Sequence, residues 1–417
     1  MTVHPKMTIE NKNKVEDRPD ISICAYQQAL HDFLSKNNFV SFRQLDEKEI
    51  YCFVTGIQNV KDLFNPKEKF QFIKNPINPE SSRLLDNPHF LYEYFKEKGY
   101  KTSEPKPIVN SNGTTLFISS GVQILENVFQ NEDQIPQEHI FVAQPVFRTQ
   151  YIEFVDEGIS TSFINVSIES INKTTADHFQ NLQNLLNFFD ALGLRKNDYH
   201  FEIDHKDSKW GDKKHRQQRI KIYYQGLEIG DALFIENFPQ NSRDYLQISD
   251  IGFGLERLKW VLRGGSYWEQ ITSGACTDYT SKTIDFTRTL SLLAGSGVVP
   301  HFKAHGYRFR LLSKRLTEEC IREKRRQDLD ILADSFYDQW SNWTRFTTPK
   351  EEAINLIRRE RVRNFNAELI SRLKEFYYDV DVDISKPTEE VVMLLRGTSA
   401  NPKHVQDILQ EMGGPIK

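Results

Sequence analysis

The chain has 417 residues and a formal net charge of −4, with 29 Phe and 16 Tyr. This length suits two or three domains, and the charge excludes a polycation, so any nucleic-acid contact needs a local basic face. The cysteines are far apart and form no CxxC pair, which excludes a zinc ribbon and argues against a disulfide framework. No apolar run can span a membrane, and the polar residues 1–20 lack the core of a secretion signal. We expect a cytoplasmic protein without membrane contact, in which 1–20 form a disordered tail.

The N-terminal quarter contains elements that the next part of the chain repeats. Helical spacing of apolar residues predicts a helix over 22–36, and 51–60 is typical of a strand. The polar, proline-bearing stretch 75–88 is typical of a linker. The same order of helix, connector, strand, glycine turn and helix recurs over 90–129. We interpret 21–87 as an extra α/β segment, which is either a duplicate of the following unit or an ordinary helix-strand pair that resembles it by chance.

The middle of the chain has the pattern of a sheet. Two alternating runs within 138–170 predict strands joined by a polar loop, and an amphipathic helix is predicted over 176–192. Four further strand-like runs follow, the last ending in SDIG. The prediction for 88–275 is therefore an α+β domain with a mostly antiparallel sheet flanked by helices. Almost wholly helical patterns over 276–417 predict a second domain.

Two arginines have the setting of anion-binding residues. Arg148 follows an apolar strand and precedes a loop, where its planar guanidinium can face a phosphate or carboxylate. Arg257 belongs to the run SDIGFGLERL, in which Gly252 and Gly254 allow close approach of a ligand before a helix. Each alone also fits a surface arginine or a common strand-to-helix turn. Combined with Asp250, which can hold an ammonium group, they favour a nucleoside triphosphate and an amino acid as ligands.

These residues resemble the class II aminoacyl-tRNA synthetases. FRTQ at 147–150 is similar to their motif 2, and GFGLERL is similar to their motif 3. The resemblance is strongest to alanyl-tRNA synthetases and runs from about Phe90 to the C-terminus. YFKEKGYKTSEPKPIVNSNGTTLFISSGVQ is similar to their opening helix, connector and first conserved strand. IDFTRTLSLLAGSGVVPHFKAHGYRFRLLSKRL is similar to the start of their helical domain for the tRNA acceptor stem, whereas their editing and C-terminal domains have no counterpart here.

The resemblance implies that ATP, with Mg²⁺, activates alanine or another small amino acid as an aminoacyl-adenylate, which is then transferred to tRNA. Arg148 would hold the α-phosphate and stabilise developing charge, and Arg257 would hold the γ-phosphate, so both are implied to be catalytic. Phe163 would stack on adenine, with Glu153 near the adenine or its ribose. The other ATP contacts would be Gly252 and Gly254. The implied amino-acid pocket contains Trp210, Asp231, Leu233, Asp250 and Gly252, and no residue is implied as a metal ligand.

Several departures from the family pattern bear on the substrate. The Gly-Pro-Cys-rich loop of the family is replaced by GDKKHRQQ, and its glutamate on the second motif 2 strand falls at about Asn165. Gly230, Asp231 and Leu233 stand where the family usually has Trp, Asn and Val, so the substrate can differ from alanine. Asp231 fits a further amino group or hydroxyl of a substrate, or it is a solvated charge at a strand end.

The predicted acceptor side also departs from the family. Ala304 and His305 stand where the family has an Asn-Arg pair, whose Asn region reads the special wobble pair of the acceptor stem. The basic runs 308–326 and 358–363 still offer a face for phosphates, or are solvated helices laced with i,i+4 ion pairs. The candidate RNA-binding residues are Arg308, Arg310, Lys314 and Arg315.

Three functions remain open at this point. The protein charges tRNA as a monomer or homodimer; or it passes the activated amino acid to a small molecule, peptide or carrier protein in a specialised biosynthetic pathway; or it is a non-catalytic relative that binds an amino acid or RNA. The helical domain favours the first function, and the altered pocket favours the second. The joint presence of Arg148, Arg257 and Asp250 argues against the third.

Overall fold

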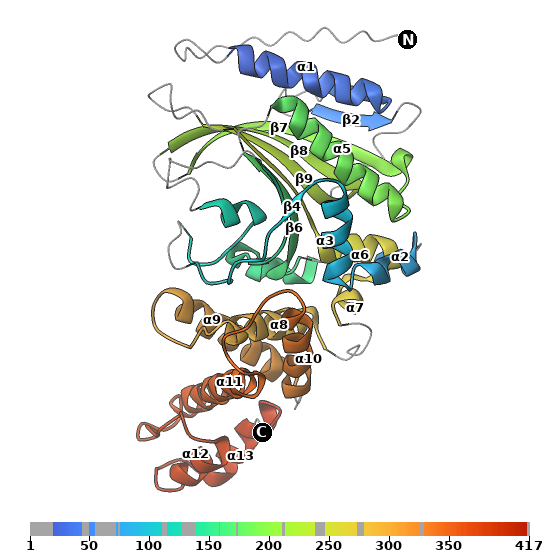
Figure 1. Ribbon diagram of the computed structural model, residues 1–417. Helices are drawn as coiled ribbons and strands as arrows, with labels where there is room; N and C mark the ends of the chain where they lie inside the picture. The colour runs from blue at the N-terminus through green and yellow to red at the C-terminus, as the bar shows by residue number, and fades with distance from the viewer. Residues whose placement is uncertain are drawn as a thin grey trace.

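The computed structural model stacks a sheet-containing part above a helical part (Figure 1). It describes residues 20–43, 50–54, 72–73, 76–110, 115–126, 138–157, 159–171, 174–210, 213–237, 247–272, 279–324 and 329–414. The predicted tail, up to residue 19, lies outside these residues. Among the described helices, none combines the length and the apolar character needed to cross a bilayer.

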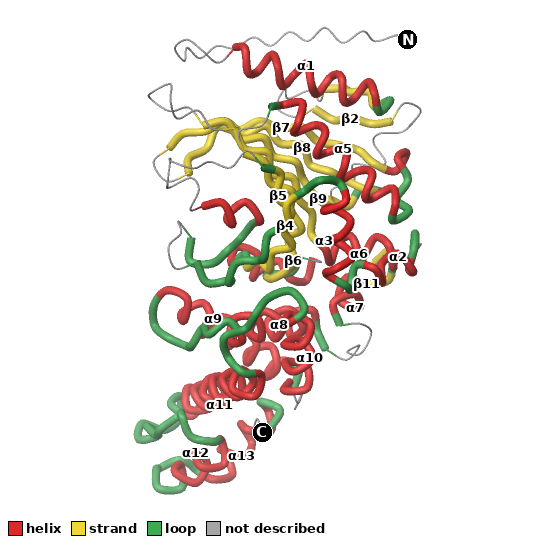
Figure 2. The backbone as a smooth tube through the Cα atoms, in the orientation of Figure 1, coloured by secondary structure: helices red, strands yellow, loops and turns green. Residues whose placement is uncertain are grey.

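One large sheet organises the upper part (Figure 2). In the described residues its strand order is β1-β2-β7-β8-β9-β10-β6-β5-β4. The pair β4–β5 is parallel and the other pairs are antiparallel, so the predicted α+β class with a mostly antiparallel sheet is confirmed. The bounds are β1 (Phe39–Arg43), β2 (Ile50–Val54), β4 (Lys101–Thr102), β5 (His139–Phe147), β6 (Ser162–Ile171), β7 (Tyr199–Trp210), β8 (Lys213–Tyr224), β9 (Leu227–Asn237) and β10 (Gln247–Gly254).

The N-terminal segment is built into this sheet. Helix α1 (Asp20–Lys36) packs on α5 (Thr175–Ala191), and β2 pairs with β7. The ring of Tyr26 lies 5.7 Å from that of Phe234 on β9, so α1 also contributes to the core. β4, from the unit that 21–87 resembles, lies at the opposite edge of the sheet. The two similar units therefore flank one sheet, although residues 55–60 of the predicted strand lie outside the description.

The expected linker at 75–88 contains a helix instead. Helix α2 (Pro79–Leu84) begins after Asn78, whose side chain accepts a hydrogen bond from the backbone nitrogen of Ser81 at 3.1 Å. Proline at the first helical position has no N–H to leave unpaired, so the Asn-Pro sequence is a helix start rather than a break. Helix α3 (Pro88–Glu97) follows, as predicted, and β3 (Phe72–Ile73) pairs with β11 (Gly265–Ser266).

Helices α1, α3 and α5 cover one face of the sheet. Residues of the strands alternate between the two faces, because successive side chains of a strand point to opposite sides. Ser249 lies on the covered face, where its hydroxyl is 2.7 Å from Nδ1 of His178 on α5. Ser170 lies there too, because its hydroxyl accepts a hydrogen bond from Asn181 of α5 at 2.9 Å. Their neighbours Asp250 and Glu169 are therefore directed to the opposite face, which we call the open face.

The lower part is helical, as predicted for 276–417. Its helices are α8 (Ser281–Gly295), α9 (Ala304–Arg322), α10 (Leu329–Ser341), α11 (Lys350–Leu373), α12 (Thr388–Leu395) and α13 (Pro402–Glu411). Apolar residues of α8, α9 and α10 join the main core, whereas the end of α11 forms a separate core with α12 and α13. Two short helices, α6 (Leu255–Arg263) and α7 (Tyr267–Ile271), lie between the last sheet strand and this part.

Buried polar contacts join the two parts. Asp285 of α8 accepts hydrogen bonds from the backbone nitrogen and the hydroxyl of Thr161, at 2.9 and 2.6 Å. Arg288 of α8 forms an ion pair with Glu256 of α6. The guanidinium carbon of Arg288 also lies 4.1 Å from the centre of the Trp340 ring. Loss of either partner would leave a buried charge unpaired. This junction therefore holds α6, and with it the end of β10, against the helical part.

Candidate functional site

The strand register places the predicted amino-acid-binding residues side by side on the open face. On β10, Asp250 is opposite Leu233 of β9, and Gly252 is opposite Asp231. A Cβ atom at Gly252 would lie 3.1 Å from both the side-chain nitrogen of Asn165 and a backbone oxygen, so a larger residue does not fit without displacement. Four residues predicted from the sequence are thus brought together by two adjacent strands.

Asp250 has an acidic neighbour that the sequence analysis missed. Glu169 of β6 is opposite Asp250 and is fully buried. The hydroxyl of Ser167 donates to Oε1 of Glu169 at 2.6 Å and to Oδ1 of Asp250 at 3.4 Å. Among the described residues, Oε2 of Glu169 has no hydrogen-bond partner.

The two carboxyl groups differ in charge state. Burial, reinforced by the charge of Asp250, raises the pKa of Glu169 well above its ordinary value. Burial also raises the pKa of Asp250, but hydrogen bonds from Glu169 and Ser167 and the charge of Arg148 oppose that rise. Because Asp250 is partly exposed and Glu169 is not, we assign the proton to Glu169 and the negative charge to Asp250.

The start of η2 (Gly121–Leu125) packs closely on these residues. A Cβ atom at Gly121 would lie 2.4 Å from the hydroxyl of Ser167 and 3.1 Å from Oε1 of Glu169. The backbone nitrogen of Gly121 donates to Oδ1 of Asn165 at 2.7 Å. Position 121 therefore requires glycine because a side chain would collide with Ser167, and not because of its backbone conformation.

Asp231 is a second acid within reach of Asp250. Burial, followed by the charges of Asp250 and Glu228, raises the pKa of Asp231 to about 7, against the opposing effects of Arg148 and Arg219. Arg219 is itself bound to Asp204, with 2.5 Å between guanidinium and carboxylate atoms. Asp231 therefore titrates near neutral pH when nothing is bound beside it.

An apolar wall borders these acids. Leu233, the residue opposite Asp250, packs against a cluster formed by η2, β5, β6, β9 and β10. The cluster consists of Val122, Ile124, Leu125, Ile140, Val142, Ile171, Ile235 and Ile248. The open face thus combines a few carboxyl groups with a hydrophobic lining, which is the usual composition of a small-molecule site.

Arg148 and Arg257 approach this face from two different elements. Arg148 follows β5; its Nε donates to the carbonyl of Ser119 at 2.9 Å, and its guanidinium carbon lies 4.8 Å from the centre of the Phe163 ring. Arg257, in the first turn of α6, donates from Nη1 to the carbonyl of Glu228 on β9 at 2.9 Å. Both arginines are partly exposed and can therefore bind a ligand's anionic groups.

The neighbouring residues of the same motif have a different setting. Glu256 is buried and accepts hydrogen bonds from the backbone nitrogen of Ile164, at 3.1 and 3.2 Å, besides its ion pair with Arg288. Gly254 faces Phe163, since a Cβ atom there would lie 3.8 Å from that ring. Glu256 is thus a structural anchor, a role that the sequence analysis did not identify.

Two predicted residues lie apart from the acids. Trp210 ends β7, which β8 and β9 separate from β10, and its side chain lies outside the described residues. Glu153, in η3 (Thr149–Glu157), is exposed and accepts a hydrogen bond from Arg315 of α9 at 2.9 Å. Glu153 thus joins the predicted ATP contacts to the predicted RNA-binding surface.

The four candidate RNA-binding residues lie on α9, where acidic groups partly neutralise Arg310, Lys314 and Arg315. Arg310 lies 3.4 Å from Glu360 and stacks 4.8 Å from the ring centre of Phe302. Lys314 and Arg315 lie 3.7 and 3.6 Å from Glu318. The guanidinium carbon of Arg308 lies 5.7 Å from the Tyr307 ring centre.

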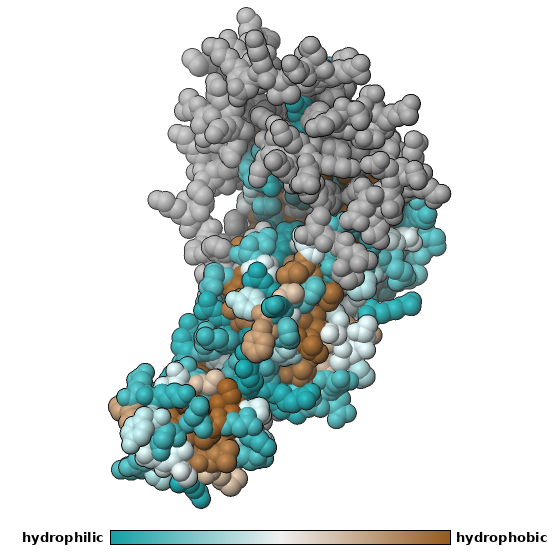
Figure 3. All heavy atoms as spheres, turned by 90° about the vertical axis from the view of Figure 1, so that its left-hand side faces the viewer, coloured by the Kyte–Doolittle hydropathy of each residue, from teal (hydrophilic) through white to brown (hydrophobic). Residues whose placement is uncertain are grey.

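Exposed aromatic side chains accompany these cations. Phe302 and Tyr307 are 75% and 48% exposed, and apolar patches interrupt the mainly hydrophilic surface of the helical part (Figure 3). His305, however, is turned to the sheet part, with Nε2 2.6 Å from the carbonyl oxygen of Leu116. The start of α9 therefore combines an internal contact with an exposed, cationic and aromatic surface.

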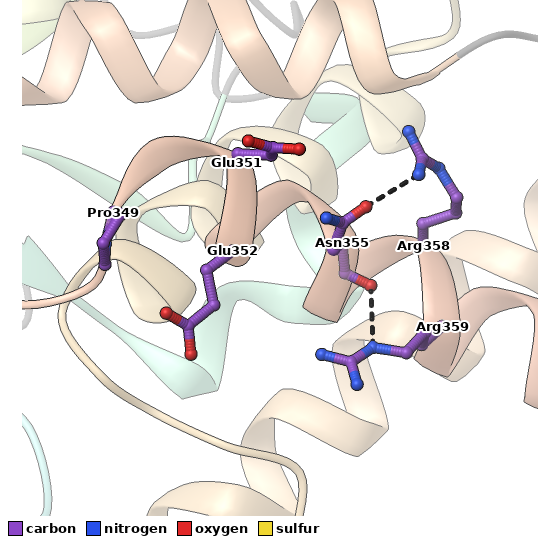
Figure 4. Close-up of a pocket in the computed structure, with 6 residues that line it drawn as sticks. All are labelled: Pro349, Glu351, Glu352, Asn355, Arg358 and Arg359. Carbon is purple, nitrogen blue, oxygen red and sulfur yellow. Dashed lines mark hydrogen bonds between the residues drawn. The ribbon is translucent and has the colours of Figure 1, made fainter.

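A shallow pocket at the start of α11 is separate from the open face (Figure 4). Its lining consists of Pro349, Glu351, Glu352, Asn355, Arg358 and Arg359. Arg358 is bound to Asp330 and Asn355, and Arg359 donates to the carbonyl of Asn355 at 3.3 Å. Because these donors are engaged within the protein, this part of the basic run 358–363 supports the ion-pair interpretation more than a phosphate site.

Comparisons with known proteins agree with the motifs. The chain is similar to the alanine–tRNA ligase of Thermoplasma acidophilum, with 24% identity over 220 residues that cover 48% of this chain and 25% of the relative. For the enzyme of Methanococcoides burtonii the identity is 21%, over 56% of this chain and 27% of the relative. For that of Halorubrum lacusprofundi it is 20%, over 84% and 47%.

The chain thus spans between a quarter and about half of the length of these curated relatives. No protein-family model matches it. The similarity is low, and it names the same family that the motif 2 and motif 3 resemblances indicate. The chain is thus similar to the alanyl-tRNA synthetases, and the similarity is distant.

Proposed function

We propose that this protein uses ATP to activate an amino acid as an aminoacyl-adenylate. The observation that carries the proposal is the strand register, which sets Asp250 beside Asp231 on a face that Arg148 and Arg257 approach from two elements. A carboxylate for an ammonium group and separate guanidinium groups for phosphates are the complement that an amino acid and ATP require. The relatives' name, alanine–tRNA ligase, supports the same reaction class.

In the proposed reaction a carboxylate oxygen of the amino acid attacks the α-phosphorus of ATP. The bond from that phosphorus to the oxygen bridging to the β-phosphate breaks, and pyrophosphate leaves. Asp250 would hold the α-ammonium group, Arg148 the α-phosphate and Arg257 the γ-phosphate, so that the acceleration comes from positioning and charge stabilisation. Phe163 would stack on adenine from the position in which it now contacts Arg148.

Mg²⁺ fits this scheme as an ion that neutralises phosphate charge when ATP is bound. It binds chiefly through phosphates and water with one or two carboxylates, so it needs no dedicated protein cage. The described residues contain no group of three His, Cys, Asp or Glu side chains arranged to hold a metal ion. The carboxylates of the open face would therefore serve the amino acid in the first place.

tRNA is the acceptor that the helical part supports. Exposed Phe302 and Tyr307 beside Arg308 and Arg310 provide stacking surfaces and phosphate contacts, which single-stranded RNA ends require. A non-RNA acceptor is the second candidate. It is favoured by His305, which bonds within the protein at the position where the relatives' Asn-Arg pair would contact RNA.

ATP–pyrophosphate exchange with each of the twenty amino acids tests the activation step. We expect exchange with at least one amino acid, and a 10²–10³-fold loss of kcat in Arg148→Ala, the size typical of removing one charge-stabilising group. Arg257→Ala should raise the KM for ATP. Arg83→Ala removes an exposed guanidinium from α2, paired only with Glu80 on its own helix in the described structure, and should have no effect.

The absence of exchange with every amino acid, or full exchange in both arginine variants, would refute the activation proposal. Charging of total tRNA in the same assay then separates the two acceptors. Exchange together with charging supports tRNA. Exchange without charging of any tRNA supports transfer to a small molecule, peptide or carrier protein.

A further inference from the structure

The open face carries more acidic groups than the single ammonium group of alanine requires. Asp250 suffices for the α-ammonium group, yet Asp231 stands diagonally beside it and Glu169 directly beside it. We propose that the preferred amino acid has a second cationic nitrogen on a short side chain, which Asp231 binds while Asp250 holds the α-ammonium group. This inference rests on the proposed activation reaction and names its substrate class.

The first support is that Asp231 lacks a cation of its own. In the described part of the chain no side chain forms an ion pair or hydrogen bond with it. On the adjacent strand, Arg219 forms an ion pair with Asp204, and Lys221 forms one with Glu202. Arg148 acts on Asp231 only through its charge, and ATP would engage that guanidinium. Asp231 is partly buried, and a carboxylate withdrawn from water without a cation beside it is unfavourable, so a cationic group of the ligand is the missing partner.

The second support is Glu169. It is fully buried, no donor of the described residues reaches its Oε2, and its carboxyl group is hydrogen-bonded to that of Asp250. With its proton, Glu169 keeps Asp250 as the charged member of the pair and positions it together with Ser167. The negative charge available to a ligand therefore sits on Asp250 and Asp231, on neighbouring strands.

The third support is the spacing of these two carboxylates. Diagonal neighbours on adjacent antiparallel strands have Cα atoms roughly 7–8 Å apart. That separation suits two nitrogens joined by a short carbon chain better than one compact ion, and the described residues contain no three-ligand metal site. Leu233 and the isoleucines of the apolar wall pack together beside Asp250, and an apolar wall disfavours a long cationic side chain on that side. We therefore expect 2,3-diaminopropionate or 2,4-diaminobutyrate rather than lysine.

ATP–pyrophosphate exchange with a matched panel of amino acids tests this inference. The panel contains alanine, serine, 2,3-diaminopropionate, 2,4-diaminobutyrate, ornithine and lysine, each with ATP and the full chain. A buried polar group left unpaired by the wrong substrate gives strong discrimination, so one short diamino acid should exceed alanine and serine in kcat/KM by at least about a hundredfold. Asp231→Asn, which keeps the shape and removes the charge, should abolish that preference, mainly through KM.

Asp190→Asn is the matched control, because it removes the same charge from α5, on the covered side of the sheet. It should leave the preference unchanged.

Thermal shift of the full chain with sulfamoyl-adenylate analogues of 2,4-diaminobutyrate and alanine gives a readout independent of turnover. The diamino analogue should stabilise the wild type more, and Asp231→Asn should lose that difference.

Preference for alanine, serine or another amino acid without a side-chain cation would overturn the inference and leave the activation proposal intact. A diamino preference that survives Asp231→Asn would likewise overturn it. No exchange with any member of the panel or of the twenty amino acids, and no stabilisation by either analogue, would instead refute the activation proposal itself.

Discussion

The two faces of the central sheet differ in how their buried polar groups are bonded, although they are formed by neighbouring residues of the same strands. On the covered face, the side chain of Asn181 lies between those of Tyr100 and Ser170, with hydrogen bonds of 2.7 and 2.9 Å. On the open face, Glu169 is the strand neighbour of Ser170, yet no donor of the described residues reaches its Oε2. Buried polar groups that satisfy each other stabilise a fold, whereas unsatisfied ones are a place for a ligand.

The largest effect that separates the faces should come from Asp250→Ala. Loss of the carboxylate leaves the substrate's ammonium group buried and unpaired, so kcat/KM for pyrophosphate exchange should fall at least about a hundredfold. The free energy of unfolding should change little, because Asp250 is partly exposed and its charge disfavours ionisation of both Glu169 and Asp231. Exchange kinetics and urea denaturation measure the two quantities. A large loss of stability with intact exchange would assign Asp250 to the core instead.

On the covered face the outcome should be reversed. Asn181→Ala leaves the hydroxyls of Tyr100 and Ser170 with one partner fewer, so the free energy of unfolding should fall by about 1–3 kcal/mol. The KM for the amino acid should not change, because α5 lies on the other side of the sheet. Urea denaturation together with exchange kinetics checks both points. A raised KM without destabilisation would contradict the distinction between the faces.

A smaller change on the open face tests its packing. Gly121→Ala inserts a methyl group into contact with Ser167, which holds Glu169 and Asp250. Displacement of Ser167 should raise the KM for the amino acid roughly tenfold, since misplacing a positioning group by a fraction of an ångström weakens binding. Gly397→Ala is the control, because the nearest atom to its Cβ would be 3.4 Å away. Equal KM values for both variants would show that η2 does not support the site.

The smallest expected effect is a dependence of stability on pH. Asp231 has a pKa of about 7 in the folded protein, against an ordinary value of 3.8. A pKa raised by folding contributes stability at pH values below the ordinary pKa, and this contribution is lost as the pH rises through about 7. The groups that face Asp231 are Asp250, Glu228, Arg148 and Arg219. Without substrate, the free energy of unfolding should therefore fall between about pH 4 and pH 7.

Urea denaturation across that range measures the slope. Glu169 contributes in the same direction because its pKa is also raised. Asp231→Asn should reduce the slope, and Asp190→Asn should retain it, since Asp190 is exposed on α5. A wild-type slope that Asp231→Asn leaves unchanged would show that Asp231 does not titrate in this range.

Periodicity, glycine placement and motifs were sufficient to predict the α+β class, the helical second part and the candidates Arg148, Asp250 and Arg257. These signals are local, because strand alternation and helical spacing depend on near neighbours in the chain. The expected linker at 75–88 was wrong even on local grounds, since Asn78 followed by Pro79 is a helix start.

Other features depended on the tertiary structure alone. Glu169 belongs to the site because β6 and β10 pair in one register, and a shift by one residue would have turned it to the covered face. Glu256 became an anchor through Arg288, a residue of another helix. The sequence by itself determined which chemical groups are present and how each strand alternates. Strand pairing and helix packing decided which carboxylates meet and which remain without a partner, because these contacts join residues far apart in the chain.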